Sequence, residues 1–163
     1  MNRQIIHNFN QIYRTPKSLY VIDIDDTIMY YKNLNKKWLS NKKDELVKHY
    51  QNRNILNKLY NLWELKLYKE NPIPTDYYGI NNLIHFCLKN ECDIILLTAR
   101  NKRVEDITKQ HVYEILEHKL PIYFASGKSK GKILKNIIKD YYYYPYNSIY
   151  FIDDLEENCE SVE

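Results

Sequence analysis

Short runs of apolar residues recur along the chain, and the residues between them follow a different pattern. The four runs lie within residues 19–24, 93–100, 122–124 and 148–152. Runs of this length predict buried strands. Between them, apolar residues recur at intervals of three and four, which predicts helices. Strands that alternate with helices favour a parallel sheet covered on both faces, so the pattern predicts an α/β fold.

Polar residues stand at the carboxyl end of three of the four runs. In a parallel sheet all strand carboxyl ends lie along one edge, where open α/β folds bind their ligands. We therefore expect these residues to converge, although they lie far apart in the sequence. Lys130, at the start of a helix that leaves the same edge, can join them. The residues at the strand ends are Asp23, Asp25, Thr27, Thr98, Arg100, Asp153 and Asp154.

The first strand ends in an unusual concentration of acids. Asp23 and Asp25 are two residues apart, so they can point to the same side of a strand and offer oxygen ligands to Mg²⁺. Carboxylates crowded at one place repel each other unless a cation or a shifted proton relieves them. An acidic turn or a helix cap explains this segment equally well by itself. The expected convergence with Thr98, Lys130 and Asp154 favours a site.

Phosphoryl transfer is the chemistry that best suits this set of groups. It needs a metal to neutralise the phosphate, a cationic side chain and donors for the phosphate oxygens. A carboxylate can be the nucleophile and form an aspartyl-phosphate. A second carboxylate two residues further on can protonate the leaving oxygen and later deprotonate water.

The residues at the strand ends and Lys130 resemble the sequence motifs of the haloacid dehalogenase-like (HAD) superfamily of phosphohydrolases. The resemblance covers nearly all of residues 19–163, outside the insertion described below, and rests on four motifs in the right order. The amino-acid sequence of residues 96–100 and 151–154, followed by Asn158, is similar to that of an acid-phosphatase-related subset of the superfamily. The motifs are matched by Asp23, Asp25 and Thr27, by Thr98, by Lys130 within Lys130–Leu134, and by Asp153 and Asp154.

The resemblance implies the roles of the metal ligands. Asp23 would be the nucleophile and a ligand of Mg²⁺. Asp25 would be the general acid and base and would give its main-chain carbonyl to the metal. Asp154 would be the third protein ligand, and Asp153 would support it or bond the lysine.

The resemblance also implies roles for the remaining residues. Thr98 and Lys130 would hold the transferring phosphoryl group, with Lys132, half a turn further along the same helix, as the alternative lysine. Thr27 would brace the loop. Arg100 would contact the substrate or cap the local structure.

The implied fold is a Rossmann-like three-layer sandwich with strand order 4-1-2-3, counting the four runs along the chain. Residues 1–163 would form one domain, with a small helical insertion at 28–73 directly after the first strand. Relatives often place a cap over the site at this point, which excludes water and selects the substrate. The lysines and aromatic residues of 28–73 suit an anionic ester. A solvated helical face packed on the core explains them as well.

Composition adds limits to these predictions. A net charge of +3 over 163 residues is too small to indicate nucleic-acid binding by itself. The three cysteines, Cys87, Cys92 and Cys159, form no metal-ligand pattern and are expected to be reduced thiols. No segment has the pattern of a signal peptide or a membrane span, so a cytoplasmic protein without a membrane partner is expected.

Three hypotheses for function follow. The first is a Mg²⁺-dependent phosphatase that acts on a small phosphorylated substrate. The second is a phosphatase for nucleic-acid ends, which only the lysines of residues 28–73 suggest. The third is a non-catalytic binding or regulatory module that keeps the fold.

Overall fold

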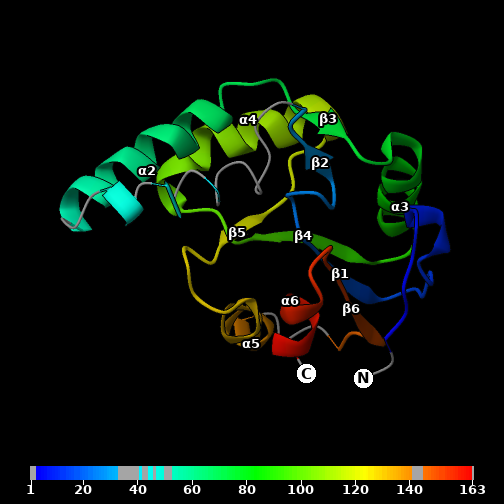
Figure 1. Cartoon of the computed structure of the whole chain (residues 1–163). Helices are drawn as coiled ribbons and strands as arrows, with labels where there is room; N and C mark the ends of the chain where they lie inside the picture. The colour runs from blue at the N-terminus through cyan, green and yellow to red at the C-terminus, as the bar shows by residue number, and fades with distance from the viewer. Residues whose placement is uncertain are drawn as a thin grey trace. The chain divides into compact units, whose positions relative to one another are not determined.

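The computed structural model describes residues 3–32, 41, 44–45, 47–49, 53–140 and 145–162 (Figure 1). The chain divides into two compact units. One comprises Met1–Met29 and Pro74–Glu163, and the other comprises Tyr30–Ile73. The functional residues predicted from the sequence all belong to the first unit.

A four-stranded parallel sheet forms the centre of the first unit. Ser18–Ile22 (β1) pairs with Asp93–Thr98 (β4) on one side and with Ser148–Ile152 (β6) on the other. Ile122–Phe124 (β5) pairs with β4. All five residues of β1 are buried, as a central strand covered on both faces should be. The predicted α/β fold with a parallel sheet is confirmed.

The strand order of this sheet is β5-β4-β1-β6. The predicted order 4-1-2-3 counted four strands, whereas Met29–Tyr30 (β2) and Ile73–Pro74 (β3) pair as a separate two-stranded sheet. These two short strands were not predicted, because a strand of two residues is too short to leave a recognisable apolar run, and they change the strand numbers. The four predicted runs themselves lie in the order 4-1-2-3 when the sheet is read from the β6 edge. In terms of residues, 18–22 lies between 93–98 and 148–152, and 122–124 lies at the edge beside 93–98.

Helices cover both faces of the sheet (Figure 1). Side chains alternate along a strand, so Tyr20 and Ile22 of β1 join one buried cluster, while Leu19 and Val21 join another. The first cluster includes residues of α3 and α4, and the second includes residues of α5. The helices are α3 (Tyr77–Lys89), α4 (Glu105–Leu116), α5 (Lys130–Asp140) and α6 (Glu156–Ser161), with short 3₁₀ turns η1 (Phe9–Gln11) and η2 (Lys102–Val104).

The chain turns sharply after β1. This strand ends at Ile22, two residues earlier than predicted, although the N–H of Asp23 still donates to the carbonyl oxygen of Ile152 on β6 at 2.9 Å. Asp26 then has a positive φ of 61°, and the N–H of Ile28 donates to the carbonyl of Ile24. The turn presents the acidic residues at the sheet edge and not along the strand.

The second unit contains the described helix α2 (Arg53–Leu67), as the helical prediction for 28–73 expects. Tyr31 and Tyr68 are buried and pack edge to face, with ring centroids 5.8 Å apart. Part of the lysine and aromatic pattern used in the prediction lies outside the described residues, namely Lys36, Lys37, Trp38, Lys42 and Lys43.

Two features bear on the compositional predictions. All three cysteines are free, and burial raises the pKa of the Cys87 thiol to about 12. Within the part of the chain that the structure describes, no helix combines the length and the apolar character needed to cross a membrane.

Candidate functional site

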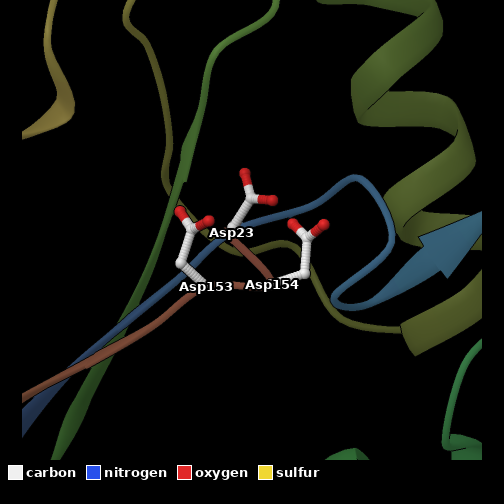
Figure 2. Close-up of side chains that lie close together, drawn as sticks. All are labelled: Asp23, Asp153 and Asp154. Atoms are coloured by element: carbon white, nitrogen blue, oxygen red, sulfur yellow. The ribbon is translucent and has the colours of Figure 1, made fainter. Parts of the chain in front are cut away.

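Three carboxylates lie together at the carboxyl ends of β1 and β6 (Figure 2). Asp23 follows β1, and Asp153 and Asp154 follow β6. One carboxylate oxygen from each lies within 4.8 Å of the others. The Asp23 residue is only 1% exposed, so its charge has little water to stabilise it. The parallel pairing of β1 with β6 is what brings these distant residues together.

Lys130 supplies the positive charge that this group needs. It is the first residue of α5, and its side chain is 2% exposed. Its ammonium donates to Asp23 Oδ1 and, at 2.6 Å, to Asp153 Oδ2. Lys132, the alternative predicted from the sequence, is exposed. Of the two lysines, Lys130 is the one in contact with the acids.

Asp153 is held by the protein on both of its oxygens. Oδ1 accepts from the N–H of Leu155 and from the side-chain amide of Asn158, each at 2.9 Å, and Oδ2 accepts from Lys130. A carboxylate bonded in this way is suited to orienting the lysine. Asp23 and Asp154 are therefore the better candidates for direct ligands of a cation.

Thr27 connects these two candidate ligands. Its hydroxyl oxygen lies 3.4 Å from Asp23 Oδ2 and 3.5 Å from Asp154 Oδ1, and it accepts the N–H of Asp154 at 3.1 Å. The carbonyl oxygen of Thr27 in turn accepts from the hydroxyl of Thr75. The predicted brace is thus a side chain that links the end of β1 to the end of β6.

Asp25 belongs to a second cluster, formed with the end of β4. Arg100 donates to both oxygens of its carboxylate, from Nη2 to Oδ1 at 2.7 Å and from Nε to Oδ2 at 3.0 Å. Thr98 Oγ1 lies 3.5 Å from Asp25 Oδ2 and accepts the N–H of Arg100 at 3.1 Å. Asp25, Thr98 and Arg100 thus form one connected unit.

Helix α4 also holds the side chain of Arg100 through a hydrogen bond. Arg100 Nη1 donates to the hydroxyl of Thr108 at 3.0 Å, and Thr108 is completely buried. His111, one turn further along α4, is 4% exposed. Burial, and secondly the positive charge of Arg100, hold the pKa of His111 below its ordinary value.

The loops after β4 and β5 are joined beside the site and carry exposed cations. The N–H of Lys102 donates to the hydroxyl of Ser126 at 3.1 Å, and the N–H of Ser126 donates to the carbonyl of Arg100. Gly127 has a φ of +81°, which a residue with a side chain rarely adopts. The side chains of Lys102, Arg103 and Lys128 are exposed.

The predicted residues therefore fall into two neighbouring groups at one sheet edge. The structure brings Asp23, Thr27, Lys130, Asp153 and Asp154 together, and it joins Asp25, Thr98 and Arg100. Sequence reasoning missed Thr108 and His111. Both lie at positions where a helical pattern reads as ordinary core, so no signal in the sequence distinguishes them.

Comparison of the sequence with protein-family models gives no match, and comparison with curated proteins gives none either. The case for a function therefore depends on the geometry of the site.

Proposed function

We propose that this chain is a Mg²⁺-dependent phosphatase of the HAD-like type, which hydrolyses a phosphate monoester through a phosphoryl group carried on Asp23. One observation carries the proposal. A buried lysine bonds a buried carboxylate at the same sheet edge where Asp154 completes a group of acids within 4.8 Å. Structural ion pairs do not need a third, exposed carboxylate beside them.

The proposed fold is the Rossmann-like three-layer sandwich of that superfamily. It is supported by the parallel sheet with helices on both faces and by functional groups that follow β1, β4 and β6. We assign the unit Tyr30–Ile73 as a small cap, because it interrupts the chain directly after the turn that carries Asp25 and Thr27.

The donor set suits Mg²⁺. The ion prefers oxygen ligands and commonly binds through one or two carboxylates with several waters. Asp23 and Asp154 would hold it, with Thr27 between them. The bound ion would supply neutralisation of the phosphate charge during transfer.

The reaction divides into two steps carried by side chains of this protein. In the first, an Asp23 oxygen attacks phosphorus, the bond from phosphorus to the leaving oxygen breaks, and Asp25 gives its proton to that oxygen. In the second, water attacks phosphorus, Asp25 takes a proton from the water, and the bond to Asp23 breaks to release inorganic phosphate. The Lys130 ammonium and the Thr98 hydroxyl would stabilise the transferring group.

The test is phosphate release from an aryl phosphate with and without Mg²⁺. We expect Mg²⁺-dependent release by the wild type and a loss on the order of 1000-fold or more in Asp23→Asn. Asp106→Asn, the same chemical change at an exposed position on α4, should retain full activity. Equal inertness of the wild type and Asp23→Asn would favour the non-catalytic module instead.

A phosphatase for nucleic-acid ends is the second candidate. It is favoured by the exposed Lys102, Arg103 and Lys128 on loops beside the site, which suit a substrate with further phosphates. Under this alternative, activity on a terminally phosphorylated oligonucleotide should fall steeply with salt, with a linear log–log slope. Triple substitution of these three residues by Gln should reduce that slope. A flat salt dependence would restrict the proposal to small substrates.

A further inference from the structure

Arg100 is a buried cation that the reaction described above does not use. Its side chain is 1% exposed, whereas the side chain of Asp25 is 13% exposed. Taking a guanidinium out of water is costly unless its partners are well placed. Here Nε and Nη2 form a fork onto the two oxygens of Asp25, the geometry in which arginine binds carboxylates most specifically.

Two further hydrogen bonds hold the Arg100 residue in place. Nη1 donates to the hydroxyl of Thr108 on α4, and the backbone N–H of Arg100 donates to Thr98 Oγ1. These contacts join the end of β4 to the body of the fold, so the guanidinium is turned inward and away from solvent. The expectation that Arg100 contacts the substrate is not favoured by this geometry.

We infer that Arg100 is a positioning residue for Asp25 in the proposed phosphatase, and the inference rests on that proposed function. The fork holds the carboxylate beside the Thr98 hydroxyl, 3.5 Å away, which is one of the groups expected to bind the phosphoryl oxygens. Arg100 therefore acts through Asp25 and sets where its proton is given and received. Thr108 holds Arg100 in place.

This role predicts a dependence on the leaving group. An alkoxide needs a proton to depart, whereas a dinitrophenolate does not, so a misplaced Asp25 harms alkyl phosphates more. In Arg100→Met we expect kcat/KM, which reports the first transfer step, to fall about 100-fold more with an alkyl phosphate than with dinitrophenyl phosphate. Arg100→Lys, which keeps the charge but loses the fork, should show a smaller bias in the same direction. Arg3→Met, at an exposed arginine, should match the wild type.

A double substitution separates positioning from a merely structural role. If Arg100 acts only through Asp25, adding Arg100→Met to Asp25→Asn should cause no further loss of kcat/KM with the alkyl phosphate. A structural role would instead multiply the two losses. Thr108→Val, which removes only the hydroxyl that accepts from Nη1, provides a milder variant if Arg100→Met does not fold.

The outcomes are distinct. A leaving-group bias in the Arg100 and Thr108 variants, with no added loss in the double variant, supports the inference. An active wild type whose variants lose the same factor on both esters overturns the role of Arg100 alone. A wild type without Asp23-dependent phosphate release overturns the proposed function, and the role of Arg100 falls with it.

Discussion

The ammonium of Lys130 lies 2.6 Å from the carboxylate of Asp153, and both side chains are almost fully buried. The same ammonium bonds Asp23 from a different strand end. One cation is therefore shared by two acids that follow neighbouring strands of the parallel sheet. Without it, two buried charges would remain unpaired, which is among the most destabilising changes a fold can undergo.

Substitution of Lys130 should accordingly cost both stability and activity. We expect Lys130→Met to lower the free energy of unfolding by about 3–5 kcal/mol, because it leaves Asp23 and Asp153 without their shared partner. Lys132→Met, on the same helix but exposed, should change it by less than about 0.5 kcal/mol. Urea unfolding of both variants measures the difference. Similar values for the two would mean that the buried lysine is dispensable.

Thr27 should tune the affinity for Mg²⁺. Its hydroxyl lies between Asp23 Oδ2 and Asp154 Oδ1, so Thr27→Val removes the group that orients both carboxylates. We expect the dissociation constant for Mg²⁺, measured by calorimetry, to rise by about 10-fold or more. Thr27→Ser keeps the hydroxyl and should bind nearly as the wild type does. Tight binding by the Val variant would contradict the bridging role.

Mg²⁺ should stabilise the folded protein through Asp154. A cation that binds only the folded state adds about 2.7 kcal/mol at a concentration of 100 times its dissociation constant, and thermal unfolding detects this as a higher midpoint. Asp154→Asn should abolish the effect, whereas Asp106→Asn should preserve it. Chelation should reverse it. Stabilisation of Asp154→Asn by Mg²⁺ to the wild-type extent would place the cation elsewhere.

His111 should make stability depend on pH. Its pKa is lowered in the folded protein, chiefly by burial and also by Arg100, whereas in the unfolded chain it is about 6.5. Between these two values the unfolded state binds more protons, so the free energy of unfolding falls as the pH falls through this window. Below the folded pKa this contribution no longer changes.

Replacement of His111 tests the direction of this pH dependence of the free energy of unfolding. Urea unfolding between about pH 7 and pH 5 should show a weaker dependence on pH in His111→Gln than in the wild type. His7→Gln, at an exposed histidine, serves as the control. An unchanged slope in His111→Gln would show that other groups determine the acid sensitivity.

The sequence was sufficient to predict the four strands of the main sheet and the edge at which their polar residues meet. Buried parallel strands are recognisable as short apolar runs, and parallel topology alone directs Asp23 and Asp154 to one edge. The two-residue strands β2 and β3 were missed because pairing, and not local pattern, defines them. The end of β1 was placed two residues late because Ile24 is apolar and buried, although it lies in the turn.

The contact partners of individual side chains were harder to predict from the sequence. Arg100 and Asp25 are far apart in the sequence, and nothing near either residue indicates a bidentate pair. The choice between Lys130 and Lys132 depends on which face of α5 meets the acids, which a spacing of two residues does not determine. The contact of Asn158 with Asp153 depends on α6, which brings the Asn158 amide to the carboxylate, and the spacing of the two residues does not indicate it.

Chemical trapping tests the central claim most directly, namely that Asp23 carries the phosphoryl group. Borohydride reduces an aspartyl-phosphate to homoserine, which peptide mass spectrometry locates by residue. With an aryl phosphate and Mg²⁺, we predict homoserine at position 23 in the wild type and none in Asp23→Asn. A wild type that releases phosphate while position 23 remains aspartate and another residue is reduced would contradict the account.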